Sequence, residues 1–177
     1  MMQSISNKIY GYDEIFFQLR NMLKNEHLPN KILLSGPKGI GKYTFSVHFI
    51  NYYLSLNEQL KYDDKNFLIN EDNKSFKLMN NLLHPNFNLI ALNNNKRIIE
   101  IDQIRNVIKY SQKNSFNDEK RFIIIDNIEL LNNNASNALL KILEEPPENL
   151  FFFLIHDSSV KILDTIKSRS ILFKKNF

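Results

Sequence analysis

Residues 31–46, KILLSGPKGIGKYTFS, combine a short apolar strand, a glycine-rich loop and the start of a helix. Glycines let the N–H groups of such a loop fold around phosphate oxygens, and the helix that follows adds its positive end. The stretch therefore predicts a phosphate-binding loop, with a glycine-rich turn that binds no ligand as the alternative. The pattern G-x-x-x-x-G-K is matched by Gly36, Pro37, Lys38, Gly39, Ile40, Gly41 and Lys42.

The residue after Lys42 bears on whether the loop can hold Mg²⁺. Loops of this kind place a small hydroxyl there, because the octahedral shell of Mg²⁺ needs a compact ligand. Here Tyr43 follows Lys42, and its phenolic oxygen lies at the far end of a rigid ring. Thr44 has a small hydroxyl but lies about 100° further round the helix. The sequence leaves ATP binding open and disfavours ordinary Mg²⁺ coordination.

Apolar runs alternate with helical patterns along the chain, which is typical of parallel strands joined by crossover helices. The predicted fold is α/β, with a five-stranded parallel sheet between helices in a single domain, 1–177. We expect strands at 31–35, 87–92, 121–126, 150–156 and 170–175. We expect helices over 11–26, 42–56, 101–112, around 135–142, over 160–168 and, less regularly, around 74–83.

Periodicity also predicts which side chains face the core. The run RFIIID (121–126) is apolar at four consecutive positions, which suits a central strand covered on both faces. Asp102 is the expected N-cap of its helix. The side chains expected to face inward are, in the helix over 11–26, Ile15, Leu19, Met22 and Leu23, and in the helix over 42–56, Phe45, Phe49 and Tyr53. In the helix over 101–112 they are Ile104, Val107, Ile108 and Ser111, and in the helix around 135–142 they are Ala135, Ala138, Leu139 and Ile142.

Bulk composition limits the possible classes of protein. The 177 residues are 43% hydrophobic, enough for a sizeable core. The chain contains no cysteine, which excludes disulfides and thiolate metal sites. No signal-peptide pattern or membrane-length apolar run occurs, so we expect a cytoplasmic protein with no membrane partner. The net charge of +4 is mild, and a solvated surface explains it better than a DNA contact.

An acidic residue ends the strand at 121–126. Asp126 occupies the place where phosphate-loop proteins put the carboxylate that holds the metal's water shell. Enzymes that hydrolyse nucleotide place a glutamate next, but here the residue is Asn127, whose amide cannot accept a proton as a base. Glu129 lies past the strand end, and we expect it to face solvent. Tyr43 and Asn127 are thus two separate defects in the same reaction.

Four segments carry a family resemblance: HLPNKILLSGPKGIGK (27–42), HPNFNLI (84–90), NASNALLKILEEPPENLFFFLI (134–155) and TIKSRS (165–170). On them the sequence resembles clamp-loader subunits of the AAA+ superfamily, and most of all the δ′ type of bacterial DNA polymerase III. The resemblance implies a three-layer P-loop NTPase fold. It also implies that 1–177 is the first of three domains, with the lid and collar domains absent.

The same resemblance implies the partners. Subunits of this family form a hetero-pentameric ring, here with γ/τ and δ subunits, as part of the DNA polymerase III holoenzyme. The ring opens a sliding clamp and places it on primed DNA during replication, using ATP bound between neighbours.

The triplet Ser168-Arg169-Ser170 stands where the family has Ser-Arg-Cys, whose arginine enters the ATP site of the adjacent subunit. The resemblance therefore implies that Arg169 is an arginine finger acting in trans. A planar, permanently charged group can neutralise charge that develops on a γ-phosphate. Without the resemblance, Arg169 would be a surface residue that stabilises a helix dipole.

Two departures from the family affect the expected site. Members often carry a four-cysteine zinc module, whereas 57–84 contains no cysteine, so no zinc is expected. The polar sensing residue at the end of the fourth strand falls at His156 or Asp157 instead of threonine. A lone histidine at a strand end is more often structural.

Two functions follow from these residues. The first is a non-hydrolysing δ′-type ring subunit that supplies Arg169 to a neighbour. The second is an active γ/τ-type ATPase motor, with Thr44 holding Mg²⁺ and another carboxylate replacing Asn127. A small-molecule kinase on the same fold lacks any acceptor-binding signature in this sequence.

Overall fold

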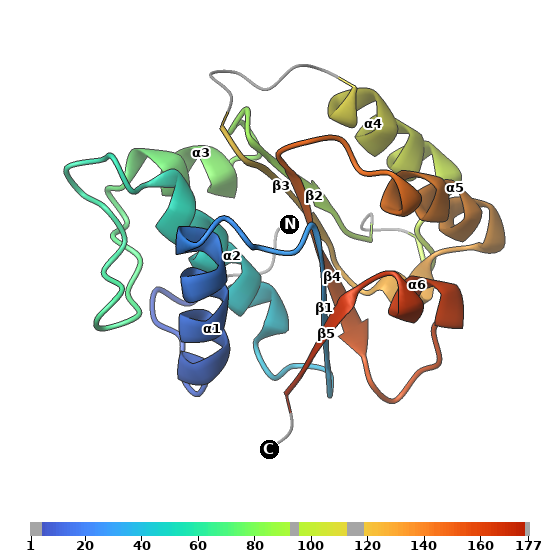
Figure 1. Cartoon of the computed structure of the whole chain (residues 1–177), viewed down its shortest axis with the longest axis horizontal. Helices are drawn as coiled ribbons and strands as arrows, with labels where there is room; N and C mark the ends of the chain where they lie inside the picture. Colours follow the sequence, from blue (N-terminus) through green and yellow to red (C-terminus); the bar gives the residue numbers. More distant parts are fainter. Residues whose placement is uncertain (1–4, 93–95, 113–118, 176–177) are drawn as a thin grey trace. The chain divides into compact units, whose positions relative to one another are not determined.

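The computed structural model describes residues 5–92, 96–112 and 119–175 (Figure 1). The chain forms two compact units that interleave in the sequence. The helical unit comprises Met1–Leu28 and Gly41–Phe87, and the sheet unit comprises Pro29–Ile40 and Asn88–Phe177.

The predicted elements are present, with bounds within four residues of those expected. The helical unit contains α1 (Asp13–Lys24), α2 (Lys42–Leu54) and α3 (Lys74–Asn80). Strand β2 (Phe87–Ile90) begins at the last residue of that unit and continues in the sheet unit. The sheet unit also contains β1 (Lys31–Gly36), α4 (Ile101–Ser111), β3 (Arg121–Ile125), the 3₁₀ turn η2 (Ile128–Leu130), α5 (Asn133–Glu144), β4 (Leu150–Asp157), α6 (Asp164–Ser168) and β5 (Ile171–Lys174).

The five strands form one parallel sheet in the order β2-β3-β4-β1-β5. All five residues of β3 are buried, which confirms that this strand lies inside the sheet. At the far end of the order, β5 pairs with β1 so that Ile171 lies opposite Ile32. At the other end of β1, Gly36 lies opposite Asp157 of β4. The strands therefore share a carboxyl edge, near Gly36, and an amino edge, near Ile32.

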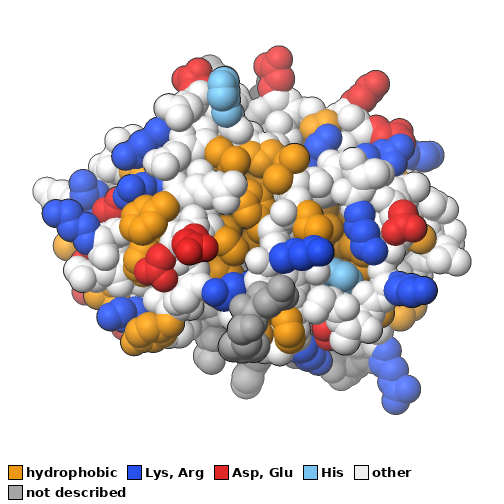
Figure 2. All heavy atoms as spheres, turned by 60° about the horizontal axis from the view of Figure 1, so that its bottom comes forward, with side chains coloured by type: hydrophobic (Ala, Val, Ile, Leu, Met, Phe, Trp, Pro, Cys, Tyr) orange, Lys and Arg blue, Asp and Glu red, His pale blue; other side chains and the backbone are white. Residues whose placement is uncertain are grey.

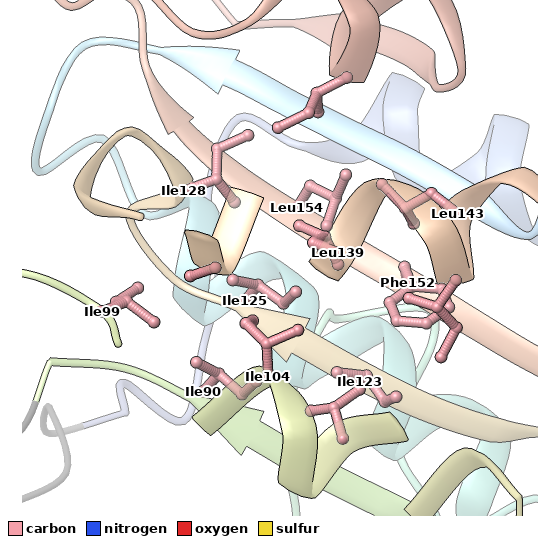
Figure 3. Close-up of a cluster of buried hydrophobic side chains, with 14 of the residues drawn as sticks. Ile90, Ile99, Ile104, Ile123, Ile125, Ile128, Leu139, Leu143, Phe152 and Leu154 are labelled. Carbon is pink, nitrogen blue, oxygen red and sulfur yellow. The ribbon is translucent and has the colours of Figure 1, made fainter. Parts of the chain in front are cut away.

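Helices α4 and α5 cover one face of this sheet. Side chains two positions apart in a strand point to the same face. Ile123 and Ile125 of β3 and Phe152 and Leu154 of β4 accordingly meet Leu139 of α5 in one apolar cluster (Figure 3). Each of these side chains is fully buried. Burying a side chain of this size contributes roughly 1.5–3 kcal/mol, so the cluster fixes the strands that carry the site.

The opposite face of the sheet carries aromatic rings. Phe122 lies 5.6 Å from Phe151 and 6.3 Å from Phe153, measured between ring centroids. All three side chains are buried. Because both faces of β3 and β4 are apolar, these strands read in the sequence as continuous apolar runs.

An aromatic cluster forms the core of the helical unit, and it corrects two sequence predictions. Phe16 of α1 is fully buried and lies 5.7 Å from Phe49 and 5.5 Å from Tyr52 of α2. Ile15 and Met22, which were expected to face inward, are only half-buried. The apolar positions of α1 permit two adjacent stripes, and the larger aromatic ring takes the interior. In α2 the interior residue is Tyr52 and not Tyr53.

The start of α4 also differs from the prediction. Glu100, not Asp102, is the N-cap, and in a capping box its backbone N–H donates to the Oε1 atom of Gln103 at 3.2 Å. Asp102 is exposed and lies 2.9 Å from Arg105. In α4, Ile104, Val107 and Ser111 are buried as predicted and Ile108 is half-buried; in α5, Ala135, Leu139 and Ile142 are buried and Ala138 is half-buried.

Positive and negative side chains are interspersed on the face shown in Figure 2, around hydrophobic side chains that gather in its middle. The charges of both signs that the described residues place on that face form no single basic patch. Among the residues that the structure describes, no helix is both long and apolar enough to cross a membrane.

Candidate functional site

The glycine loop keeps a backbone shape that its glycines make possible. Gly39 and Gly41 have φ angles of 84° and 86°, a left-handed conformation that side chains disfavour. Pro37, Lys38 and Gly39 are exposed, and Ile40 is half-buried. In many anion-binding loops, residues with left-handed backbone conformation direct successive N–H groups towards the anion. The loop backbone is thus compatible with phosphate binding.

Gly36 is required for a different reason, which the sequence analysis missed. A Cβ atom at Gly36 would lie 2.4 Å from the carbonyl oxygen of Lys175 and 2.6 Å from the Cδ1 atom of Ile40. The backbone N–H of Lys175 donates to the carbonyl oxygen of Ser35 at 2.9 Å, which fixes this close approach. The first glycine of the loop therefore lets the chain after β5 pack against β1.

The first turn of α2 lies in the helical unit. Lys42 and Tyr43 are both buried, with 6% of each residue exposed, and Thr44 is half-buried. Tyr43 is thus a core residue. The hydroxyl of Ser46, one turn on, donates to the carbonyl oxygen of Lys42 at 2.9 Å. Thr44 therefore carries the one small hydroxyl of this first turn.

Tyr12 lies beside the loop end within the same unit, and sequence reasoning missed it. A Cβ atom at Gly41 would lie 3.8 Å from its ring. The ring also stacks on Phe45, with centroids 4.7 Å apart. Burial raises the pKa of Tyr12 to about 12, so its phenol stays neutral at physiological pH.

Asp126 and Asn127 lie at the carboxyl edge of the sheet unit, as predicted from the strand pattern. Asp126 is 5% exposed, and its backbone N–H donates to the carbonyl oxygen of Ile90 at 2.8 Å. Asn127 adopts a left-handed conformation, with φ 57° and ψ 61°. Asparagine tolerates this conformation better than glutamate does. The conformation of the turn after β3 thus explains why asparagine occupies position 127, independently of catalysis.

Glu129 corrects a prediction, because it does not simply face solvent. Its Oε2 atom accepts a hydrogen bond from the backbone N–H of Asp157 at 3.2 Å, and the residue is half-buried. The 3₁₀ turn after β3 directs the chain back towards the end of β4. A carboxylate therefore lies at the same sheet edge as Asp126 and Gly36.

His156 joins three segments at this edge. Its Nε2 atom lies 2.7 Å from the carbonyl oxygen of Val160, and its Nδ1 atom lies 2.9 Å from the hydroxyl of Ser35. Because a carbonyl oxygen only accepts, Nε2 donates to Val160, and Nδ1 pairs with the Ser35 hydroxyl. Both ring nitrogens are used within the fold, so His156 has a structural role.

Arg169 lies at the amino edge, away from the loop. It is the C-cap of α6 and comes just before β5, whose Ile171 pairs with Ile32. Its Nη1 atom donates to the carbonyl oxygen of Thr165 at 3.1 Å, and its Nη2 atom donates to Glu144 of α5 at 2.8 Å.

The structure thus brings Gly36, Asp126, Asn127 and Glu129 to one edge of the sheet unit and Arg169 to the other. Lys42, Tyr43 and Thr44 belong to the helical unit. Among the described residues, no cluster of three or more His, Cys, Asp or Glu side chains could hold a metal ion.

Residues 11–176 match the family described as DNA polymerase III, delta subunit. The chain belongs to this family. A DNA polymerase III subunit delta′ from Buchnera aphidicola subsp. Schizaphis graminum is 36% identical over 143 residues, which cover 81% of this chain and 42% of that protein. A DNA polymerase III subunit tau from Bacillus subtilis is 32% identical and matches 91% of the chain and 27% of its own length. Membership confirms the family resemblance, while the finger role of Arg169 stays a prediction.

The fold is also found in solved structures. A DNA polymerase III gamma subunit-related protein from Thermotoga maritima superposes with a TM-score of 0.63 at 21% identity, over 90% of this chain and 46% of that one. This likeness confirms the α/β, P-loop NTPase (AAA+) fold. The chain spans less than half the length of the family relatives described above.

Proposed function

We propose that the chain is the nucleotide-fold domain of a δ′-type clamp-loader subunit that does not hydrolyse ATP itself. It supplies Arg169 in trans to the ATP site of a neighbouring subunit. The partners are γ/τ and δ subunits in a hetero-pentameric ring, and the ring acts on a sliding clamp and primed DNA. Curated delta′, tau and gamma subunits all resemble this chain, which supports a clamp-loader subunit. The choice of the δ′ type rests on Tyr43 and Asn127.

The observation that carries the proposal is the separation of Arg169 from the carboxyl edge. Ile171, two residues after Arg169, pairs with Ile32, whereas Gly36 ends the same strand β1. A strand rises about 3.3 Å per residue, so the two edges are roughly 13 Å apart. A guanidinium at the amino edge is poorly placed to reach a phosphate bound at Gly36. A site on another chain is the natural target for it.

Two residues support the absence of hydrolysis in this domain. Tyr43 is part of the helical-unit core, so no compact ligand for Mg²⁺ follows Lys42. Asn127 takes the left-handed turn after Asp126 and offers no general base. Loss of a general base alone lowers a rate by about 10²–10⁴.

An active γ/τ-type motor is the second candidate, and Glu129 is the observation in its favour. Its carboxylate is half-buried at the carboxyl edge and could replace the missing base. Thr44 would then hold Mg²⁺. Against this candidate, the Oε2 atom of Glu129 already accepts the backbone N–H of Asp157. ATP turnover that is lost in Glu129→Gln and in Lys42→Ala would favour the motor.

The experiment that tests the finger is a reconstituted ring containing Arg169→Ala. We expect the ring to assemble, as measured by gel filtration, with slower ATP turnover in the presence of clamp and primed DNA. Arginine fingers contribute about 10³–10⁵ to the rate at the site that they enter. Lys167→Ala is the matched control, since Lys167 is an exposed cation two positions away. Unchanged turnover with Arg169→Ala would refute the finger role.

A further inference from the structure

The guanidinium of Arg169 is held within its own sheet unit by two contacts. Nη1 donates to the carbonyl oxygen of Thr165, one turn earlier in the same short helix. Nη2 donates at 2.8 Å to the Oε1 atom of Glu144, which ends α5 and lies 25 positions away in the sequence. The first contact is local, and the second links two helices through opposite charges.

These contacts use one N–H of each terminal nitrogen, and a bidentate phosphate would engage the same two nitrogens. Arginine binds phosphate best through two parallel N–H groups, in a bidentate arrangement. Here both terminal nitrogens of Arg169 already donate to acceptors of the same chain. The Glu144 carboxylate is the charged one of the two acceptors. It therefore competes with a phosphate for the same group.

We propose that Glu144 is the counter-ion that retains Arg169 on its own subunit until the γ-phosphate of a neighbour's ATP displaces it. This inference rests on the proposed role of Arg169 as an arginine finger. Glu144 thereby raises the ATP concentration that the neighbouring site needs before the finger engages. It acts through Arg169 and touches no substrate itself.

The exposure of the pair makes this exchange feasible. The side chain of Arg169 is 34% exposed and that of Glu144 is 53% exposed. Water screens an ion pair at such a position, so the pair is weak and reversible. A triphosphate brings more negative charge than a single carboxylate, and its charge-assisted hydrogen bonds to arginine are strong. The phosphate is therefore able to win the competition when it is present.

The test is Glu144→Gln in the full subunit, reconstituted into the ring. Glutamine keeps the shape and an acceptor oxygen but removes the charge. We expect the KM for ATP to fall by up to about fivefold, with kcat unchanged. An exposed ion pair changes an equilibrium constant by about this factor. Glu145→Gln is the matched control, because it removes the same charge at the next exposed position. Its KM should equal that of the unaltered ring.

Other outcomes would overturn the inference. A lower kcat with an unchanged KM would mean that Glu144 orients Arg169 for catalysis and does not restrain it. An unchanged KM and kcat would mean that the pair has no role in engagement.

The double variant separates this inference from the function on which it rests. If Arg169→Ala slows turnover, the finger role stands, and the effect of Glu144→Gln must then vanish in the Arg169→Ala background. If Arg169→Ala leaves turnover unchanged, the proposed function itself fails. A Glu144→Gln effect that persists without Arg169 would overturn the retaining role alone.

Discussion

Arg169 and Asp126 lie at opposite edges of one parallel sheet. Asp126 directly follows β3 at the carboxyl edge, and Arg169 directly precedes the region where β5 begins at the amino edge. Groups separated by more than about 10 Å usually act independently. Changes at Asp126 should therefore affect nucleotide on this chain, while changes at Arg169 should affect nucleotide on a neighbour.

Gly36→Ala should destabilise the sheet unit even in the absence of nucleotide. The added methyl group would lie 2.4 Å from the Lys175 carbonyl oxygen, which is backbone and cannot rotate away. Overpacking of this kind costs about 1–3 kcal/mol. Urea denaturation followed by circular dichroism measures the change in unfolding free energy.

Gly39→Ala is the comparison for that variant. No atom lies within 4 Å of a Cβ built at Gly39, so only its left-handed backbone, with φ 84°, opposes the substitution. We expect a loss of about 1 kcal/mol. If Gly36→Ala unfolds at the same urea concentration as the unaltered chain, the proposed reason for this glycine is wrong.

Asn127→Glu should not create an ATPase. Glutamate at φ 57° is disfavoured by roughly 1–2 kcal/mol, so the turn after Asp126 strains or shifts when the side chain is introduced. Phosphate release from ATP and Mg²⁺ should stay at the background of Lys42→Ala, and the unfolding free energy should fall. Asn127→Gly tests the conformational argument, since it should retain stability. Turnover above that background in Asn127→Glu would show that the missing base alone silences the domain.

The strands of this fold were predictable because parallel strands buried on both faces leave an unmistakable apolar run. FIII in β3 and FFFLI in β4 are such runs, and the structure buries both completely. Which helical side chains face the core was less predictable, because the neighbouring residues Ile15 and Phe16 each belong to an apolar stripe with a 3.6-residue period. Packing against Phe49 and Tyr52 selected Phe16, and that information lies outside the helix.

In the site, too, features set by neighbouring residues in the sequence could be predicted, and contacts between distant residues could not. Asp126 follows a recognisable strand, so its place at the sheet edge could be predicted. The contact of Glu129 with Asp157 depends on a 3₁₀ turn that brings together residues 28 positions apart. The Glu144 partner of Arg169 comes from another helix, and no local pattern announces it. Position along a strand was therefore predictable, while side-chain partners were not.

Magnesium should leave the affinity of the chain for ATP unchanged. Tyr43 is buried in the helical unit and cannot offer the compact hydroxyl that the octahedral shell requires. Isothermal titration calorimetry with ATP, with and without Mg²⁺, measures this directly. Lys42→Ala serves as the control for binding at the loop. Binding that tightens markedly with Mg²⁺, and does so only when Lys42 is present, would point to Thr44 as a metal ligand and to the motor function.

His48 should make the stability of the chain fall between about pH 6.5 and pH 4. It is completely buried; its Nε2 atom lies 2.8 Å from the carbonyl oxygen of Ser6, and its Nδ1 atom lies 2.9 Å from the Tyr62 hydroxyl. The carbonyl accepts a hydrogen from Nε2, so the neutral ring accepts the Tyr62 proton at Nδ1. Desolvation by burial lowers the pKa of His48 to about 4, against a partly offsetting effect of the Ser6 carbonyl.

The sign follows from which state binds the proton. Below pH 6.5 the unfolded chain protonates His48 while the folded chain does not, so falling pH stabilises the unfolded state relative to the folded one until the pH reaches the folded pKa near 4. A difference of about 2.5 in pKa corresponds to roughly 3 kcal/mol at most. Carboxylates titrate in the same range, so the difference between the unaltered chain and His48→Gln isolates this contribution. The difference in unfolding free energy, measured with urea from pH 7.5 to 4, should shrink as the pH falls; a difference that is constant across this range would exclude a buried neutral histidine.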